Sequence, residues 1–287
     1  MSIYSLYSNK KPVMSFEVFP PKRDGKLDNL TYTLERLSAL GPDYISVTFG
    51  AGGSGAERLT FDTALSIKNR FGIEPLVHLT CINHTKPEID RILKSLKQHG
   101  LMNILALRGD INPEIPLKND FAYASDLVEY IKKQGGYSIS AACYPEGHLE
   151  SKSIVEDTLN LKRKVEFGAT HLISQLFFDN NMFYAFCERT KLAGIDVPID
   201  AGIMPVVNKK QIERMVNLCG ASLPVKFRKV LDKYEDKPEA LKEAGIAYAV
   251  DQIIDLISQG VDGIHLYTMN NPEIAEKIFK GFYSLIH

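Results

Sequence analysis

The feature of the sequence that most limits its fold is a repeated alternation of two periodicities. Short runs rich in β-branched and aromatic residues, which are typical of strands, are each followed by longer stretches with apolar residues at helical spacing. The alternation occurs eight times. The runs that predict strands are 13–19, 43–49, 76–81, 103–107, 138–144, 171–178, 197–206 and 262–269.

The helical stretches complete this pattern. They cover 27–40, 56–71, 87–99, 121–133, 151–167 and 181–192, then 209–218, 223–234 and 238–258, and finally 272–285. A doubly wound sheet also alternates strands and helices, but it usually stops near six strands. Eight strand-then-helix units without a low-complexity linker therefore predict a (β/α)8 TIM barrel, with residues 1–287 forming a single catalytic domain.

Composition excludes several classes of partner. Lysine and arginine number 34 against 35 acidic residues, so the chain has no electrostatic footprint for nucleic acid or an anionic membrane. Residues 1–12 lack the apolar core of a signal peptide, and no stretch approaches the roughly 20 apolar residues of a membrane span. The four cysteines form no C-x-x-C pair, which argues against structural zinc or disulfides. We expect a soluble cytoplasmic protein that acts on small molecules; a homo-oligomer is compatible with the sequence.

Polar side chains stand near the ends of nearly all the predicted strands, where a barrel of this type carries its active site. Three of them, Glu17, His78 and Gln175, lie inside apolar runs, where a polar group needs a partner. Each has a structural alternative, because Glu17 could pair with an inner-barrel cation, His78 could be a satisfied core histidine and Gln175 could bond to backbone. Asp110 could simply cap a turn. The set is Glu17, Thr48, His78, Thr80, Arg108, Gly109, Asp110, Tyr144, Glu146, His148, Gln175, Asn208, Gln211 and Tyr267.

Two local motifs are ambiguous. Residues 50–55 satisfy G-x-G-x-x-G after a strand, but they belong to the second of eight units, so a glycine-rich loop is favoured over a dinucleotide fingerprint. The basic run Lys162-Arg163-Lys164 usually indicates a solvated helix face, with phosphate binding as the minority interpretation. No G-x-S-x-G, paired Cys/His nucleophile or H-E-x-x-H is present. The chemistry is therefore expected to be done by something bound.

Eight blocks in order give the chain a resemblance to a known family. They are 15–22 (SFEVFPPK), 46–53 (SVTFGAGG), 78–81 (HLTC), 107–110 (LRGD), 123–127 (YASDL), 144–146 (YPE), 161–164 (LKRK) and 202–206 (GIMPV). Together, over about residues 12–285, the chain resembles methylenetetrahydrofolate reductase in its single-domain bacterial form, without a regulatory domain. The resemblance implies a flavin-containing (β/α)8 barrel. Such an enzyme passes hydride from NADH or NADPH through FAD to 5,10-methylenetetrahydrofolate, which becomes 5-methyltetrahydrofolate.

The resemblance also implies roles for individual residues. Glu17 would be the general acid that opens the folate ring, kept protonated by its apolar neighbours. Asp110 would lie near the flavin ring, where its charge favours hydride donation and stabilises a cationic iminium. Gln175 would contact the pterin, and Gln211 and Tyr267 would also contact substrate. FAD would be held by Thr48, His78, Arg108, Gly109, Asp110, Tyr123, Ala124, Tyr144, His148, Asp157, Asn160, Arg163 and Lys164, which reverses the default interpretation of the basic run.

The sequence departs from family relatives at two positions. Met215 replaces an aromatic residue that helps stack the nicotinamide or the folate tail, and methionine stacks less well. Asn271 replaces an arginine found in some relatives, and it cannot address a folate carboxylate by charge. Both substitutions concern the contacts expected with the nucleotide and with the folate tail, and not the reaction that the resemblance implies.

Two other functions stay open at this stage. One is a metal-dependent barrel lyase with Glu17, His78, His148 and Asp110 as ligands, although no strand carries an H-x-H pair. The other is a non-catalytic flavin or folate carrier, which would keep Tyr144 and Lys164 but would not need Glu17. The preference between NADH and NADPH is undetermined because no ribose-reading residue can be named, and the sequence does not decide whether a partner protein donates electrons.

Overall fold

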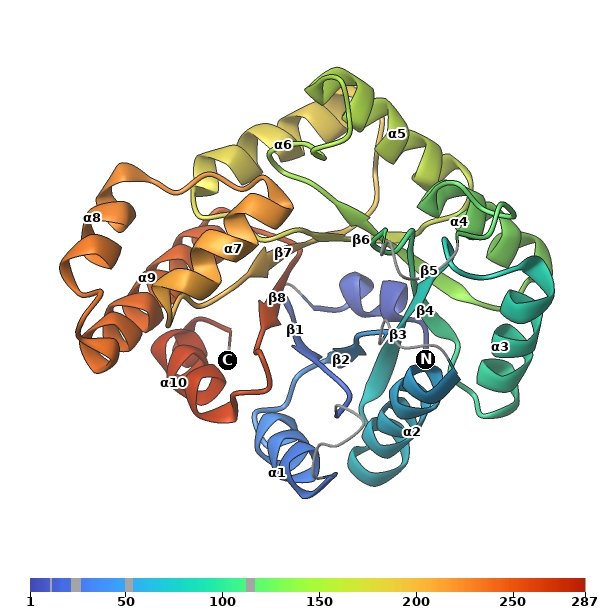
Figure 1. Ribbon diagram of the computed structural model, residues 1–287, viewed down its shortest axis with the longest axis horizontal. Coiled ribbons are helices and arrows are strands. Elements are labelled where there is room, and N and C mark those ends of the chain that lie inside the picture. The colour runs from blue at the N-terminus through green and yellow to red at the C-terminus, as the bar shows by residue number, and fades with distance from the viewer. Residues whose placement is uncertain (11, 22–26, 50–53, 112–116, 287) are drawn as a thin grey trace.

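Eight parallel strands close into a barrel in the order in which they occur in the chain (Figure 1). The structure is a computed structural model that describes residues 1–10, 12–21, 27–49, 54–111 and 117–286. The last strand pairs with the first, from Val13 opposite Gly263 to Glu17 opposite Tyr267. The strands are β1 Val13–Val18, β2 Tyr44–Val47, β3 Glu74–Thr80, β4 Asn103–Leu107, β5 Ser138–Cys143, β6 His171–Ser174, β7 Ile199–Ile203 and β8 Gly263–Tyr267. The predicted (β/α)8 barrel is confirmed.

Helices surround the barrel and cover the outer face of the strands (Figure 1). They are α1 Leu27–Ser38, α2 Ser54–Phe71, α3 Lys86–Gln98, α4 Ala124–Gln134, α5 Ile154–Glu166, α6 Asn180–Leu192, α7 Lys209–Cys219, α8 Val225–Lys233, α9 Pro238–Ser258 and α10 Pro272–Phe282. Two 3-10 helices, η1 Ile3–Ser8 and η2 Tyr283–Leu285, lie near the termini. None of the helices built from the described residues is long and apolar enough to cross a lipid bilayer.

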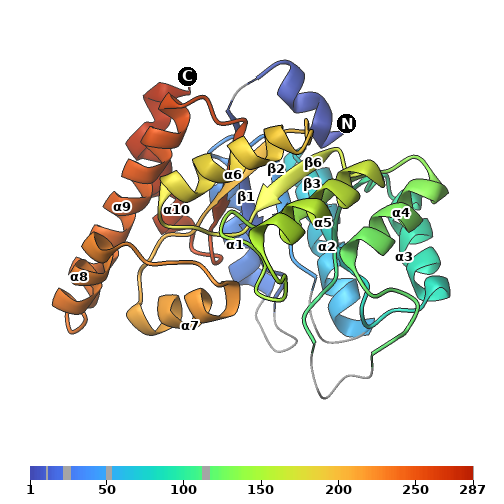
Figure 2. The same cartoon turned by 90° about the horizontal axis from the view of Figure 1, so that it is seen from above.

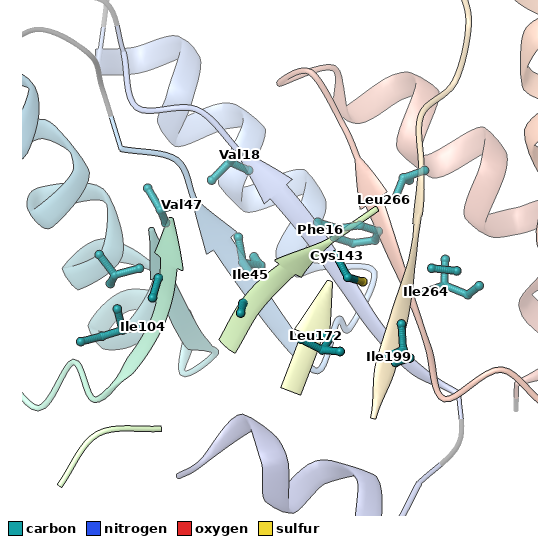
Figure 3. Packing of buried hydrophobic residues seen from close by; sticks show 14 of the residues in the cluster. Phe16, Val18, Ile45, Val47, Ile104, Cys143, Leu172, Ile199, Ile264 and Leu266 are labelled. Carbon is teal, nitrogen blue, oxygen red and sulfur yellow. The ribbon is translucent and has the colours of Figure 1, made fainter. Parts of the chain in front are cut away.

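The main core lies between the strands and the helices. Side chains alternate along a strand, so Phe16 and Val18 of β1 point outward with Ile45 and Val47 of β2 (Figure 3). The intervening residues Ser15, Glu17 and Ser46 point into the barrel, where a row of buried polar groups replaces the usual apolar filling. That polar interior is the first structural indication of a reactive centre.

A second apolar cluster supports the part of the barrel near α7, α8 and α9. Leu176 and Phe178, which follow β6, pack there with Met204, Ile212 and Phe227. This packing explains why β6 ends at Ser174 and not at the predicted residue 178, because the chain leaves the sheet to enter the cluster. The prediction for this strand end was wrong by four residues, and Gln175 lies just beyond the strand.

The end of the barrel opposite to α7 is closed by η1, a helix that was not predicted from the sequence. Figure 2 shows η1 and α7 on opposite sides of the molecule. Tyr7 of η1 donates a hydrogen bond to Asp200 Oδ1 at 2.6 Å, and Tyr44 donates to Asp200 Oδ2 at 2.6 Å. Because the Tyr7 hydroxyl hydrogen is used on Asp200, His171 Nε2 at 2.8 Å must donate to the Tyr7 oxygen. We call this group, Tyr7, Tyr44, His171 and Asp200, the floor cluster.

Residues 50–53 of the glycine-rich loop and Lys22 lie outside the described residues.

The start of one helix differs from the prediction. Helix α4 begins at Ala124 and not at the predicted residue 121, because Asp126 Oδ2 accepts hydrogen bonds from the backbone N–H groups of Ala122 and Tyr123, at 2.9 Å each. This local cap holds the preceding residues out of the helix.

Candidate active site

A buried carboxylate and two histidines meet inside the barrel. Glu17 Oε2 lies 3.6 Å from His78 Nε2 and 3.7 Å from His265 Nε2. The three residues come from β1, β3 and β8, and they are 8%, 6% and 0% exposed. Glu17 is the last residue of β1 to pair with β8, opposite Tyr267, so the carboxylate stands near the carboxyl end of its strand. This is where a barrel of this type performs its chemistry.

His78 is the uncharged partner in this group. Burial lowers its pKa to about 4, with the charge of Glu17 opposing that shift and His265 adding to it. The imidazole is therefore neutral near pH 7, and its contact with Glu17 is no ion pair there. Its Nε2 is buried and has no hydrogen-bond partner among the residues that the structure describes. A buried polar atom without a partner marks a position where a ligand or a substrate proton can bond.

His265 was missed by the sequence analysis. Its Nδ1 lies 2.7 Å from Ser15 Oγ, and its Nε2 lies 3.4 Å from Ser46 Oγ. The signal was present, because His265 is two residues before Tyr267 on one strand and so shares its inward face. Only the pairing of β8 with β1 places it beside Glu17.

A cavity of about 550 Å³ opens beside β4, β5 and α5. Most of the residues that the resemblance assigns to FAD line it, although they come from four separate parts of the chain. Its lining includes Arg108, Tyr123, Ala124, Tyr144, His148, Asp157, Asn160, Arg163 and Lys164. Glu150, Ser151 and Glu156, which had no predicted role, line it as well.

The wall of this cavity is suited to an anion and an aromatic ring. Lys164 Nζ donates to the Ala142 carbonyl oxygen at 2.9 Å and lies 5.7 Å from the centre of the Tyr144 ring. Burial lowers the pKa of the Lys164 ammonium and, likewise, that of the His148 imidazole, which packs edge-on against Tyr144. Two further cations, Arg108 and Arg163, face the same space. This donor set fits the phosphates of a dinucleotide cofactor.

Arg108 is already paired with a carboxylate where it lines the cavity. Its guanidinium binds Glu150 through two contacts, and the contact from Nη2 to Oε1 is 2.8 Å long. Both residues line the cavity, so the Glu150 carboxylate occupies the kind of position that a phosphate oxygen would take. The carboxylate is the more exposed partner, at 57%.

The remaining predicted cofactor residues lie at neighbouring strand ends, outside this cavity lining. Thr48 follows β2, and its N–H donates to the Val18 carbonyl oxygen at 3.1 Å. Gly109 has a φ of +91°, and a Cβ there would lie 3.1 Å from Thr80 Cβ, so both backbone and space favour glycine. Asp110 is exposed just beyond β4. Burial, followed by the charge of Asp110, raises the pKa of the Cys219 thiol at the end of α7 to about 11.

The predicted substrate residues adjoin the second apolar cluster, since Gln175 precedes Leu176, Gln211 precedes Ile212 and Tyr267 packs against the cluster. Gln175 is half-buried, and its Oε1 accepts the Leu176 N–H at 2.9 Å. Gln211 lies in the first turn of α7, which Asn208 caps through a hydrogen bond from the Gln211 N–H at 3.0 Å.

Tyr267 owes its position to a glycine on the neighbouring strand. Its hydroxyl donates to the Ser174 carbonyl oxygen at 2.7 Å. Gly202 makes room for the ring, since a Cβ there would stand 2.2 Å from the Ser174 oxygen and 2.8 Å from Tyr267 Cε2. Burial raises the pKa of the Tyr267 hydroxyl well above its usual range, so it stays protonated.

The two positions that depart from the family have different surroundings. Met215 lies one turn after Gln211 on α7 and packs against the second apolar cluster. Asn271 is the N-cap of α10, where its Oδ1 accepts the Ile274 N–H at 3.2 Å. The asparagine side chain is therefore engaged with its own helix, a role that an arginine at this position could not perform.

The metal-dependent lyase alternative gains no support. Within the described part of the chain, no three His, Cys, Asp or Glu side chains are grouped so as to hold a metal ion. Of the four proposed ligands, Glu17 and His78 are together inside the barrel, while His148 lines the separate cavity beside Tyr144.

The closed barrel and the polar group near its strand ends are typical of (β/α)8-barrel enzymes, which carry their active sites at the carboxyl ends of the strands. A family model described as methylenetetrahydrofolate reductase matches residues 2–282. The chain belongs to the methylenetetrahydrofolate reductase family, and it is an oxidoreductase.

Individual relatives agree with this assignment. The chain is 40% identical over 265 residues to 5,10-methylenetetrahydrofolate reductase of Escherichia coli (strain K12), covering 92% of this chain and 88% of that one. It is 35% identical to methylenetetrahydrofolate reductase (NADH) 1 of Arabidopsis thaliana, of which it covers 48%.

Solved structures show the same fold at low sequence identity. An uncharacterized protein from Clostridium thermocellum that binds two copies of 5-methyl-5,6,7,8-tetrahydrofolic acid matches with a TM-score of 0.63, at 14% identity and over 99% of each chain. A dihydropteroate synthase from Coxiella burnetii, in complex with pteroic acid, matches with a TM-score of 0.55, at 13% identity and over 96% of this chain and 94% of that one.

Proposed function

We propose that this chain reduces 5,10-methylenetetrahydrofolate to 5-methyltetrahydrofolate. The observation that carries the proposal is the identity of 40% to a bacterial enzyme named for this substrate, over 92% of the chain. The inner-barrel group of Glu17, His78 and His265 supports it, because it offers a buried acid beside two imidazoles. We further propose that residues 1–287 act as one catalytic domain, in agreement with the closed barrel.

The redox group in this proposal is FAD, with NADH or NADPH as the hydride donor. FAD supplies hydride transfer from the nicotinamide to the folate when it is bound. Arg108, Arg163 and Lys164 would hold its phosphates, and Tyr144 would give an aromatic surface beside Lys164. Tyr123, Ala124, His148, Asp157 and Asn160 would complete the contacts along the cavity, and Thr48, His78, Gly109 and Asp110 would contact FAD from the strand ends.

Glu17 would be the proton donor to the folate. Opening the five-membered ring of the substrate requires a proton on the departing nitrogen, and a general acid within hydrogen-bond reach supplies it. Glu17 is nearly buried, and its nearest imidazole, His78, is neutral at the pH of reaction. Gln175 just beyond β6, Gln211 on α7 and Tyr267 on β8 would orient the pterin and the rest of the folate.

The negative charge of Asp110 would stabilise the cationic substrate that forms when the ring opens. Replacing Asp110 with asparagine keeps the size of the side chain and removes the charge. We expect folate reduction to slow about tenfold or more, while FAD content and the rate of reduction by NADH stay near wild type. Stopped-flow measurement of the two half-reactions checks this, and an unchanged folate half-reaction would exclude an electrostatic role.

The contact between Glu150 and Arg108 predicts competition with the cofactor. Since a partly exposed ion pair contributes up to about 1 kcal/mol, Glu150→Gln should free Arg108 and tighten FAD binding by up to about fivefold. Titrating the FAD-free protein with FAD, followed by flavin fluorescence, measures the affinity.

Glu156→Gln is the matched control, because Glu156 lines the same cavity and accepts a hydrogen bond from the Lys152 N–H, away from Arg108. Equal gains in the two variants would mean that FAD responds to the net charge of the cavity and not to the release of Arg108.

The function as a whole can be tested in one anaerobic cuvette. Purified protein with FAD should show a flavin spectrum that bleaches on addition of NADH and recovers when methylenetetrahydrofolate is added. Bound flavin that only NADPH bleaches would fix the donor as NADPH. Protein that takes up no flavin from added FAD would overturn the cofactor assignment.

A further inference from the structure

The loop between β8 and α10 continues the barrel beyond the point where its backbone ladder stops. The ladder between β1 and β8 ends at Glu17 opposite Tyr267. Past that point, Thr268 Oγ1 donates to the Glu17 carbonyl oxygen at 2.6 Å. Asn270 then meets the backbone of Phe19 twice, since its Oδ1 accepts the Phe19 N–H and its Nδ2 donates to the Phe19 carbonyl oxygen, both at 2.9 Å.

The side-chain amide of Asn270 takes the place of one more peptide group in the sheet. A primary amide carries an acceptor and a donor side by side, as the backbone of a neighbouring strand does. Here the backbone of Phe19, just beyond the end of β1, satisfies both. Thr268 and Asn270 therefore hold the backbone on both sides of Val18. On the other edge, the Val18 carbonyl oxygen accepts a hydrogen bond from the N–H of Thr48, which follows β2. Glu17 is itself one end of the segment that they hold.

The backbone of this loop is held in an unfavourable form. Met269 and Asn270 have φ values of 51° and 56°, and they are the non-glycine residues with positive φ in the described ranges. Asparagine tolerates this left-handed region, whereas methionine does so poorly. The carbonyl oxygen of Asn270 accepts a bond from Thr33 Oγ1 at 3.4 Å, and its N–H donates to Thr268 Oγ1 at 3.2 Å. Strain of this kind persists where the surroundings impose it, and it is commonly found beside functional groups.

We infer that Asn270, assisted by Thr268, is a positioning residue that fixes the Glu17 carboxyl group for proton delivery by clamping the backbone of β1 on both sides of Val18. The inference rests on the proposed function, in which Glu17 is the acid. It assigns a role in the reaction to a loop residue that need not touch the substrate. A displacement of the acid by a fraction of its hydrogen-bond length is enough to slow proton transfer.

The decisive variant is Asn270→Asp, which keeps the shape and the acceptor but places a carboxylate oxygen against the Phe19 carbonyl oxygen. In the FAD-loaded enzyme, we expect kcat for folate reduction to fall about tenfold or more, with the KM for folate and the rate of reduction by NADH little changed. In a Glu17→Gln background the same substitution should cause no further loss, because the acid it positions is gone.

Three further variants separate positioning from simple damage to the loop. Met269→Gly relieves the left-handed backbone and leaves the hydrogen bonds intact, so its rate should stay near wild type. Where Asn270→Asp does not fold, Thr268→Val removes the hydroxyl that bonds Glu17 and should slow folate reduction, while Thr268→Ser keeps the hydroxyl and the rate.

The outcomes distinguish this inference from the proposed function. A wild-type folate rate in Glu17→Gln refutes the acid role, and the inference with it. If Glu17→Gln is slow and adding Asn270→Asp slows it a further tenfold, as Asn270→Asp does alone, only the inference is refuted. The loss caused by Asn270→Asp would then not depend on Glu17. The inference alone is likewise refuted if Asn270→Asp slows reduction by NADH as much as it slows folate reduction.

Discussion

Replacing Glu17 with glutamine is expected to reduce the folate half-reaction by about 10²- to 10⁴-fold, the range that general acid catalysis contributes. Glutamine matches the size of glutamate and can still face His78, but it has no proton to deliver to the departing nitrogen. The loss corresponds to about 3 to 5 kcal/mol in the activation free energy. Anaerobic mixing of the NADH-reduced enzyme with methylenetetrahydrofolate measures it directly.

The same variant contains its own control, since FAD content and reduction by NADH do not require the acid and should match wild type. Glu74→Gln is a matched second control. Glu74 is the first residue of β3, at the opposite end of the barrel, and it pairs with Lys68. Normal folate turnover in Glu17→Gln, or an equal loss in Glu74→Gln, would contradict the assignment of Glu17 as the acid. Turnover in wild type that is lost in Glu17→Gln also excludes a non-catalytic carrier.

The largest effect on stability is expected from Asp200→Ala in the floor cluster. Asp200 is fully buried and accepts the hydroxyl hydrogens of Tyr7 and Tyr44. Burial, followed by the charge of Asp200, raises the pKa of both tyrosines well above the usual range, so both remain donors at any pH of interest. Removing the carboxylate leaves two buried hydroxyls without their acceptor. The free energy of unfolding should fall by about 3 to 5 kcal/mol.

Urea denaturation followed by circular dichroism checks this value. Tyr7→Phe is the graded comparison, because it removes one donor and leaves Asp200 bonded to Tyr44, and it should cost about 1 to 2 kcal/mol. If Asp200→Ala unfolds at the same urea concentration as wild type, the floor cluster does not contribute to stability in the way its hydrogen bonds indicate.

The sequence predicted the barrel because the two periodicities are local properties, visible in each run of residues. It also pointed to Glu17 and His78, since a polar group inside an apolar run is conspicuous. The contact of His265 with Glu17 was not predictable in the same way. It depends on the register of β8 against β1, which joins residues some 250 positions apart in the chain and leaves no local pattern.

Three other features were not predicted from the sequence, for related physical reasons. Asn270 lies in a polar loop, where asparagine is common. Its role becomes visible only through its two hydrogen bonds to the backbone of Phe19. Tyr7 and Asp200 are 193 residues apart, so neither the helix η1 nor its attachment to the floor could be inferred from nearby residues. The end of β6 was misplaced because Leu176 and Phe178 continue the apolar run while packing in a different cluster.

The floor cluster also has a consequence for how the chain is made. Synthesis begins at the N-terminus, yet Tyr7 has no acceptor until Asp200 has emerged, and β1 lacks one neighbour until 263–267 has emerged. Tyr7 and β1 are therefore synthesised long before these partners and must wait for them. Contacts this distant in sequence also form slowly. In the nascent chain, β1 is thus accessible to chaperones and proteases until β8 has been synthesised and has paired with it.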